Sequence, residues 1–197
     1  GKNTNLLLHG GRGSEFVLTT KTWERAYTNV ISTIPVRATL RLLGLPQHGD
    51  YETMYLHSLF FRGILGPPGE IFFNFTPHGA WKRAVVFSRM YAASVAEDHF
   101  TVEVTSRSAA GTTAFADEFA EHATALGLVR EPRLVGSLVT PDAYPVYRKG
   151  RSDGGSIDRR QIEEAGVWVA GRQGRFEYLR SSEAMKQAAS VVQGSEA

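Results

Sequence analysis

Two glycines separated by two residues follow a short apolar segment near the end of the chain. Gly171 and Gly174 come directly after residues 167–170, Val-Trp-Val-Ala, and a helix is predicted a few residues later. Glycine lets the backbone approach a ligand closely, and the start of a helix offers N–H groups and positive potential. The segment is therefore typical of a site for a carbonyl oxygen or an anion just beyond a sheet. On spacing alone, a tight strand-to-helix turn fits at least as well.

An arginine and two tyrosines near this turn could also contact a ligand. Arg172 follows the predicted buried strand directly, and its planar guanidinium could donate to a carbonyl or a phosphate group. A structural ion pair is the alternative for this residue. Tyr144 and Tyr147 lie earlier, in the segment Ala-Tyr-Pro-Val-Tyr, and each could be a core aromatic residue whose hydroxyl reaches the rim of the core. The residue types alone leave these alternatives open.

The composition excludes several kinds of site. The 197 residues include no cysteine, which excludes disulfides, thiolate nucleophiles and zinc–sulfur centres. The six histidines show no paired spacing typical of a metal site, so we predict no metal. The 22 basic residues are scattered among 20 acidic ones, and a formal net charge of +2 makes a poor surface for nucleic acid.

The location of the protein is predicted from what the sequence lacks. No apolar run approaches the length of a membrane span, and the first residues do not have the pattern of a signal peptide. The absence of cysteine fits a reducing compartment. We therefore expect a cytoplasmic protein that binds neither a membrane nor nucleic acid.

The first part of the chain is predicted to form a hairpin and a short helix. Residues 15–20 and 26–32 are rich in β-forming residues, and residues 21–25 between them are typical of a turn. The strand over residues 30–35 ends at Pro35, which cannot donate to a ladder. Residues 36–45 are apolar at helical spacing and include Gly44 as a stop signal.

Further strands are predicted over residues 57–65, 71–75, 84–89 and 100–104. The clearest helix spans residues 114–126, because its apolar residues lie on one stripe and Gly127 follows it. A polar helix over 157–164, a buried strand over 167–170 and a helix over 182–193 with Ser181 as N-cap complete the chain. The predicted fold class is α+β, with an antiparallel sheet and helices followed by one β-turn-α unit.

The segment over residues 167–178, Val-Trp-Val-Ala-Gly-Arg-Gln-Gly-Arg-Phe-Glu-Tyr, resembles the closing flavin-binding motif of the FAD-dependent amine-oxidase-like superfamily. UDP-galactopyranose mutases and protoporphyrinogen-oxidase-like proteins belong to that superfamily. In its members a strand ends in Gly-Arg, an aromatic-rich turn follows, and the last helix points its N-terminus at the isoalloxazine ring. The resemblance implies that the β-turn-α unit completes a Rossmann-type FAD domain, and that the antiparallel sheet belongs to a substrate domain.

Two other segments resemble parts of the same superfamily, and together the matches extend from Phe16 to Val192. Residues 143–147 resemble a segment whose last tyrosine, here Tyr147, faces the substrate or the flavin. Residues 22–35 resemble the hairpin that returns the chain from the substrate domain to the FAD domain. Arg83 precedes a predicted strand, where related flavoproteins place an arginine facing the substrate, and a charged surface residue is the alternative reading.

The resemblance implies FAD as cofactor and assigns a set of site residues. The flavin-contacting residues are Gly171, Arg172, Gly174, Tyr178, Ser181 and Ser182. The substrate-binding residues are Tyr147 and Arg83. No catalytic residue is assigned, because in a flavoenzyme the cofactor carries the chemistry and the protein binds and orients it.

The chain departs from the superfamily pattern in two places. Where members often have a polar residue, a methionine and then an aspartate or a histidine, this chain has Arg180-Ser181-Ser182, so any flavin contact there would come from backbone N–H groups. The first strand of the FAD domain and its Gly-x-Gly-x-x-Gly turn are missing, and Gly-Gly-Arg-Gly at residues 10–13 has the wrong spacing and no following helix. We therefore expect a second polypeptide to carry the dinucleotide-binding half.

These inferences predict a domain organisation and a function. Residues 1–140 would form mainly the substrate-binding sheet and helices, and residues 141–197 the FAD-contacting segment. The function would be that of an FAD-binding subunit or fragment of a two-chain flavin-dependent oxidoreductase, which acts on a small metabolite and is inactive alone. One alternative is a redox-neutral flavin-dependent mutase acting on a nucleotide sugar. The other is a non-catalytic accessory subunit that stabilises a flavoprotein partner.

Overall fold

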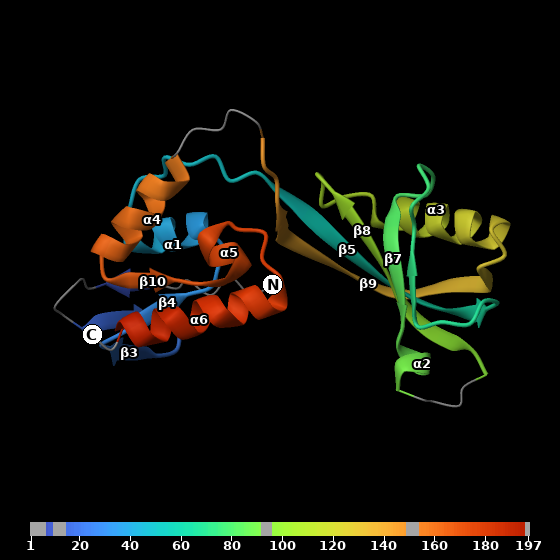
Figure 1. Cartoon of the computed structure of the whole chain (residues 1–197), viewed down its shortest axis with the longest axis horizontal. Coiled ribbons are helices and arrows are strands. Elements are labelled where there is room, and N and C mark those ends of the chain that lie inside the picture. Colours follow the sequence, from blue (N-terminus) through green and yellow to red (C-terminus); the bar gives the residue numbers. More distant parts are fainter. Residues whose placement is uncertain (1–6, 10–14, 92–95, 149–153, 196–197) are drawn as a thin grey trace. The chain divides into compact units, whose positions relative to one another are not determined.

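The chain forms two compact units, and one is inserted into the other (Figure 1). The computed structural model describes residues 7–9, 15–91, 96–148 and 154–195. Unit 1 comprises the residues up to Glu52 together with those from Pro145 onward, and unit 2 comprises Thr53–Tyr144. The predicted division at residue 140 therefore has to be corrected, because residues up to 52 belong with the C-terminal segment and not with the inserted sheet.

The described residues of unit 2 form one five-stranded sheet, with the strand order β6-β7-β8-β5-β9, and two helices. The pairs β6–β7, β7–β8 and β8–β5 are antiparallel. The elements are β5 Thr53–Leu65, β6 Ile71–Phe73, β7 Trp81–Val86, α2 Phe87–Met90, β8 Asp98–Ser106, α3 Thr112–Ala125 and β9 Val129–Pro145.

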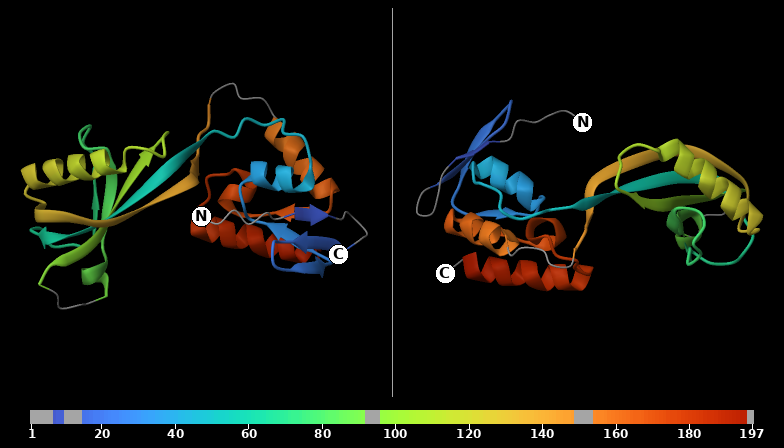
Figure 2. Two further views of the ribbon diagram at one scale, coloured as in Figure 1. Left: turned by 180° about the vertical axis from the view of Figure 1, so that it is seen from behind. Right: turned by 90° about the horizontal axis from the view of Figure 1, so that it is seen from above.

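Helix α3 packs on one face of this sheet (Figure 2). Strands β5 and β8 alternate between buried apolar and more exposed residues, as a sheet with one covered face requires. The buried residues of the strands and the helix form one core, which includes Leu59, Phe61, Trp81, Phe100, Val102, Val104, Ala116, Phe119 and Ala123. The alternation therefore determines which side chains of unit 2 remain on the open face.

In the described part of unit 1 there are a three-stranded antiparallel sheet with the order β1-β2-β3, a two-stranded parallel sheet formed by β10 and β4, and four helices. The elements are β1 Leu7–His9, β2 Phe16–Thr19, β3 Glu24–Tyr27, β4 Val30–Ser32, α1 Val36–Leu43, α4 Gly154–Glu164, β10 Val167–Val169, α5 Gly171–Arg175 and α6 Ser181–Ser195. Among the described helices, none is long and apolar enough to cross a lipid bilayer.

The parallel sheet is covered by helices on both faces, with α1 and α4 on one side and α6 on the other (Figure 1). Val167 and Val169 are buried in a core that also contains Leu40 of α1 and Ile162 of α4. Trp168 points to the opposite face, where its ring approaches Gly194 of α6. Helices on both faces are the usual environment of parallel strands.

Most of the expected elements are present, and the fold class is mixed α and β as predicted. The helix expected over residues 36–45 is α1, and Gly44 ends it in the left-handed conformation with φ 67°. The prediction missed β9, the longest strand. It also missed α5, which occupies the glycine turn, and it extended the strand over 84–89 into the residues that form α2.

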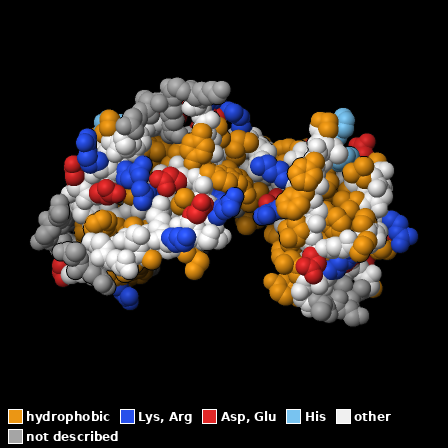
Figure 3. Space-filling view, in the orientation of Figure 1, with side chains coloured by type: hydrophobic (Ala, Val, Ile, Leu, Met, Phe, Trp, Pro, Cys, Tyr) orange, Lys and Arg blue, Asp and Glu red, His pale blue; other side chains and the backbone are white. Residues whose placement is uncertain are grey.

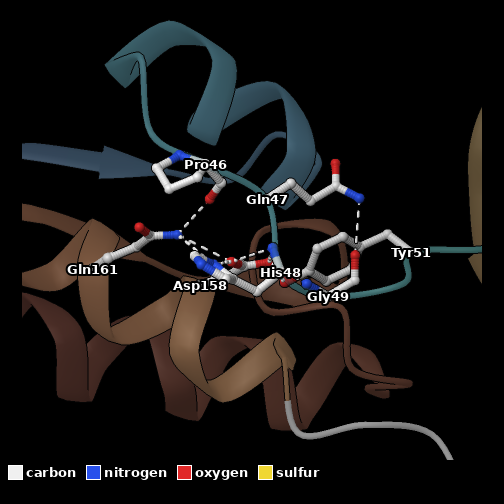
Figure 4. A network of polar contacts seen from close by, with 7 residues as sticks. All are labelled: Pro46, Gln47, His48, Gly49, Tyr51, Asp158 and Gln161. Atoms are coloured by element: carbon white, nitrogen blue, oxygen red, sulfur yellow. Dashed lines mark hydrogen bonds and ion pairs between the residues drawn. The ribbon is translucent and has the colours of Figure 1, made fainter.

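A buried carboxylate joins the segment after α1 to helix α4 (Figure 4). Asp158 is fully buried and accepts hydrogen bonds from the backbone N–H groups of His48 at 2.8 Å and Gly49 at 2.7 Å, and from the Tyr51 hydroxyl at 2.9 Å. Gln161 donates to the same carboxylate at 3.0 Å. Together with the His48 ring, whose Nδ1 atom lies 2.9 Å from the carboxylate, five groups from two segments distant in sequence converge on one side chain.

The same contacts lower the pKa of Asp158. Burial alone raises the pKa of a carboxyl group, because it disfavours the charged form. Here the hydrogen bonds from Gly49, His48 and Tyr51 outweigh burial, so the pKa of Asp158 lies below its ordinary value. The charged form thus contributes to the stability of unit 1 at neutral pH.

We expect Asp158→Asn to lower the free energy of unfolding by about 2–4 kcal/mol at pH 7, because the amide turns a donor toward groups that are themselves donors. A group with a lowered pKa stabilises the fold fully above the ordinary carboxyl value of about 4, and this contribution is lost as the pH falls through the lowered value. The difference in the free energy of unfolding between the variant and the wild type should therefore shrink below about pH 4. Urea unfolding at several pH values measures it.

Asp50→Asn is the matched control, because Asp50 lies in the same segment and is exposed. Its effect should stay within about 0.5 kcal/mol at every pH. Equal losses for the two variants, or a gap for Asp158→Asn that persists unchanged at low pH, would contradict the structural role of this carboxylate.

Candidate functional site

The candidate site lies at the carboxyl ends of β4 and β10. The two strands are parallel, with Val167, Trp168 and Val169 opposite Val30, Ile31 and Ser32. The amide of Ala170 continues the ladder by donating to the carbonyl oxygen of Ser32 at 3.0 Å. In open sheets of parallel strands, ligands bind beyond the carboxyl ends of the strands. The glycine turn and the start of α6 follow β10 at this edge.

The two positions of the turn require glycine for different structural reasons. A Cβ atom at Gly174 would lie 2.7 Å from the carbonyl oxygen of Ser32, so this glycine lets α5 pack against β4. Gly171 has φ 79°, which disfavours other residues, and the space beside its Cα atom is open. Its amide is already used, because it donates to Oε1 of Gln187 in α6 at 2.7 Å.

An aromatic residue in the left-handed conformation ends α5. Phe176 has φ 52°, which is uncommon for a bulky residue and costs free energy that the surroundings must supply. Its carbonyl oxygen accepts a hydrogen bond from the Tyr147 hydroxyl at 3.1 Å. The Tyr51 ring packs edge-on against the Phe176 ring at 5.0 Å. These contacts fix the path of the chain from α5 toward α6.

The Arg172 side chain is held by the residues that follow the turn. Its Nη2 atom donates to the carbonyl oxygen of Leu179 at 2.7 Å, and its guanidinium lies 4.7 Å from the centre of the Tyr178 ring. A guanidinium over an aromatic face is stabilised by electrostatic attraction. Tyr178 is 62% exposed, so the outer face of this pair is open to solvent.

The start of α6 is capped by Glu183, whose carboxylate accepts from the amide of Arg180 at 2.6 Å. Arg180 therefore occupies the cap position and Ser181 is the first helical residue, which corrects the expectation that Ser181 is the N-cap. Ser181 and Ser182 are exposed. The first amides of a helix have no partner within it, and this end of the helix carries positive potential.

Glu177 connects the turn to two helices. Its carboxylate lies 3.3 Å from Nη1 of Arg159 in α4, and Gln187 of α6 donates to it at 3.1 Å. The Nε atom of Arg175 is 3.4 Å from the same carboxylate, in a geometry too poor for a hydrogen bond. The turn is thus anchored on both sides by polar contacts.

An apolar groove of about 210 Å³ runs beside β4. None of the predicted site residues lines it. Its walls come from the hairpin, from β4 and the residues after it, and from α1, and they include Leu18, Tyr27, Val30, Ile31, Ile34 and Leu42. This groove was not predicted from the sequence. The apolar residues before Pro35 are the feature of the sequence that could have indicated it.

Arg83 lies in unit 2, on the face of the sheet opposite α3. A bulge in β7 between Trp81 and Arg83 places this arginine opposite Glu103, and the two form a paired hydrogen bond at 2.8 and 2.7 Å. Phe60 lies on the same face and is 38% exposed. Hydrophobic side chains gather over this unit (Figure 3), and among the described residues no cluster suitable for a metal ion occurs.

The structure brings most of the predicted site residues together in unit 1. The glycine turn, Arg172, Tyr178, Ser181 and Ser182 follow one another around the carboxyl end of β10, and Tyr147 reaches the same turn through Phe176. Arg83 belongs to the other unit. Sequence reasoning missed Gln187 and Glu177, because the partners of these polar residues come from other helices and leave no local pattern.

Comparison with known proteins supports a flavoprotein-like fold. No family model and no curated protein matches this sequence. Among solved structures, reduced UDP-galactopyranose mutase is similar with a TM-score of 0.62 at 17% identity over 80% of this chain. A protein described as a protoporphyrinogen oxidase from an Exiguobacterium species gives a TM-score of 0.65 at 16% identity over 97%. A fatty acid isomerase from P. acnes gives 0.60 at 10% identity over 96%.

At these identities the similarity concerns the fold alone. The chain spans 38% of the mutase, 46% of the oxidase and 47% of the isomerase. The expected resemblance to this group of proteins is thus confirmed at the level of a partial fold. More than half of each larger structure has no counterpart in this sequence.

We expect Gly174→Ala to destabilise the protein by about 1–3 kcal/mol, because the added methyl group would force α5 away from the backbone of β4. Gly155→Ala is the matched control: its methyl group would meet only the Tyr51 hydroxyl, at 3.8 Å. That change should be neutral or slightly stabilising, since alanine loses less backbone entropy than glycine in a helix. Thermal unfolding compares the two, and equal transition temperatures would contradict the close contact between α5 and β4.

Proposed function

We propose that this chain is the FAD-contacting and substrate-domain half of a flavin-dependent oxidoreductase that acts on a small metabolite. The observation that carries the proposal is the carboxyl edge of the β4–β10 pair, where an open glycine turn and the start of α6 follow the strand. The similarity of the fold to an oxidase, a mutase and an isomerase supports it.

The groups at this edge fit a flavin ring in part. The amides that begin α6, at Ser181 and Ser182, lie at an exposed helix start and suit the carbonyl oxygens of the pyrimidine edge. The open space beside Gly171 would let a planar ring approach the backbone. Gly174 has a different role, because its missing side chain makes room for Ser32.

Positive potential is the contribution of α6. A bound flavin would supply hydride acceptance, and the N–H donors and positive potential of a helix start would stabilise negative charge on its reduced ring. In our proposal the amide of Ser181 supplies one such donor. The guanidinium of Arg172 lies over Tyr178 and adds a second positive charge beside the turn.

The two residues proposed to bind the substrate, Tyr147 and Arg83, belong to different units. Tyr147 is 55% exposed beside the turn, and its hydroxyl is fixed by Phe176. The face of the sheet in unit 2 opposite α3 carries Phe60 together with the Arg83–Glu103 pair. Because Glu103 balances the charge of Arg83, this face favours a substrate with apolar surface over a strongly anionic one.

The adenosine diphosphate part of FAD requires another polypeptide segment. A dinucleotide pyrophosphate binds at a Gly-x-Gly-x-x-Gly turn, and this sequence has no such turn. We therefore propose that a second polypeptide supplies it.

The two alternative functions make different demands on the same residues. A mutase that acts on a nucleotide sugar would need arginines open to a diphosphate, whereas Arg83 is paired with Glu103 and Arg172 with Leu179 and Tyr178. A non-catalytic accessory subunit would bind its partner without turnover. The residues Arg180-Ser181-Ser182 agree with that role, because they offer backbone groups alone to a flavin.

We expect the chain, purified with its native partner, to show the absorption spectrum of a flavin and to contain a second polypeptide with a Gly-x-Gly-x-x-Gly turn. In that complex Ser181→Pro should weaken flavin binding by about tenfold or more, because one charge-assisted hydrogen bond contributes about 1.5–3 kcal/mol. Proline is well tolerated at the first position of a helix, so α6 should stay intact. The measurements are the flavin content and the reduction potential of the bound flavin, and both should be lower in Ser181→Pro than in the wild type.

Ser181→Ala is the matched control, since it removes the hydroxyl and keeps the amide. It should bind flavin like the wild type. A complex that stays colourless after addition of FAD would overturn the proposal. Flavin that is bound but never reduced by any metabolite would favour the accessory subunit, and activity that requires prior reduction of the flavin would favour the mutase.

A further inference from the structure

The five-stranded sheet of unit 2 has two edges of different character. Among the described strands, β9 forms one edge of this sheet and β6 forms the other. Strand β9 contains Pro132 and Pro141, and it has Arg130, Glu131 and Arg133 near its start. Prolines and charges on an edge strand prevent it from pairing with another chain. Strand β6 has the sequence Ile-Phe-Phe and contains neither, so it is the edge that remains suited to pairing.

The outward backbone groups of β6 belong to Ile71 and Phe73. The amide of Asn74 donates to a carbonyl oxygen of β7 at 2.8 Å, and the carbonyl oxygen of Glu70 accepts from an amide of β7 at 2.7 Å. Residues 70 and 74 therefore direct their backbone groups toward β7. Successive residues of a strand direct these groups to opposite edges. The N–H and C=O groups of Ile71 and Phe73 thus face away from β7, where another strand would meet them.

The side chains along this edge are apolar and exposed. Ile71 is 47% exposed, Phe73 is 55% exposed and Phe75, just after the strand, is 92% exposed. The ring centres of Phe73 and Phe75 lie 6.1 Å apart, with 25° between the ring planes, so the two rings form one aromatic surface. Exposed apolar surface that is concentrated in one place is typical of an interaction site.

The turn after β6 holds Phe75 in a fixed position. The side chain of Asn74 donates to the carbonyl oxygens of His78, Gly79 and Trp81 at 2.8, 2.9 and 3.0 Å. A side chain presented by a turn that is already ordered loses little conformational freedom on binding. Phe75 is therefore suited to be the anchor of an interface.

A groove of about 250 Å³ lies beside the same edge. Its walls are formed by Pro67, by residues 72–76, by Trp81, and by Leu126 and Leu128 at and after the end of α3. An apolar cavity of about 150 Å³ is large enough to bind benzene, so this groove has room for a phenyl ring. The β6 edge thus carries both a protruding phenyl ring and a groove that can accept one.

A second copy of this chain would occupy the strand edge and the groove together. A twofold axis places β6 antiparallel to the β6 of the second copy, in the same sense as the pairing of β6 with β7. If Phe72 of one copy lies opposite Phe72 of the other, Ile71 pairs with Phe73 of the second copy and their outward N–H and C=O groups meet. The same register places Phe75 opposite Gly69 of the second copy, two residues after the proline that lines its groove.

The exposed area at this edge agrees with a dimer that dissociates on dilution. Ile71, Phe73, Phe75 and Leu126, which is 58% exposed, present about 500 Å² per copy if a large side chain contributes about 200 Å². Two copies would then bury about 1,000 Å², which is close to the lower limit for a specific interface. Because a twofold axis uses β6 of both copies and β9 is protected, the association ends at the dimer.

We propose that this chain forms a twofold-symmetric dimer through β6, with the two unit 2 sheets joined into one and with Phe75 of each copy in the groove of the other. The proposal does not depend on flavin binding, because none of these residues belongs to the candidate site of unit 1.

Two substitutions at the edge and one matched control test the dimer in the full chain. Phe75→Ser removes the anchor, and Ile71→Lys adds a charge of the kind that protects edge strands. Leu138→Ser is the control, because Leu138 is an apolar residue of the opposite edge strand and is 57% exposed. Sedimentation velocity over a wide range of protein concentration gives the dissociation constant of each variant.

We expect Phe75→Ser and Ile71→Lys each to raise the dissociation constant about tenfold or more, as loss of a buried aromatic anchor or strand pairing does, and Leu138→Ser to change it less than about twofold. The circular dichroism and thermal unfolding of the variants, measured as monomers at low concentration, should match the wild type. In the wild type, the amides of Ile71 and Phe73 should become protected from hydrogen exchange as the concentration rises.

Several outcomes would overturn the proposal. These are a chain that stays monomeric at every concentration, a dimer that neither edge substitution weakens, and a dimer whose Ile71 and Phe73 amides stay unprotected. A monomer that binds phosphatidylcholine vesicles through Phe75 would assign the edge to a lipid surface and would also overturn it. A flavin-containing complex with one copy of this chain would overturn the dimer and leave the proposed function standing, whereas a β6 dimer that never binds flavin would do the reverse.

Discussion

The structure of unit 1 depends on the parallel pairing of β4 with β10. These two short strands come from either side of the inserted unit, and their ladder brings the two parts of unit 1 into one sheet. Every feature of the candidate site follows from that pairing. The glycine turn lies at the carboxyl end of β10, Gly174 packs on Ser32 at the end of β4, and α6 returns to cover Trp168. Asp158 supports the same arrangement from the other end, because it ties the segment that leaves α1 to α4.

The fold could be predicted from the sequence wherever local signals determine the structure. Helix α1 with its terminal Gly44 and the stripe of α3 are examples, because capping and periodicity act over a few residues. Strand β9 could not be predicted, because Pro132, Pro141 and a residue with positive φ, Asp142, are locally typical of turns. It is a strand because β5 pairs with it. The insertion of unit 2 has the same explanation, since the pairing that defines it is not local.

The candidate site was predictable as a segment but not in the detail of its contacts. The succession of an apolar strand, two glycines and a helix is visible in the sequence, and the structure has it in that order. The sequence does not reveal that Gln187 already binds the amide of Gly171, or that Glu183 and not a serine caps α6. Both are longer polar side chains whose partners depend on how two helices meet. Such contacts follow no regular spacing in the sequence and cannot be predicted from it, whereas strands and helices have characteristic periods of apolar residues.

Strand β4 positions the candidate site, because its alternate residues direct their backbone groups to different edges of the strand. The backbone of Ser32 is bound to β10 and lies against α5, so it positions the glycine turn. The backbone of Ile31 points the other way, toward the open edge. The contacts of Ser32 with β10 and with α5 therefore hold the glycine turn beside the start of α6.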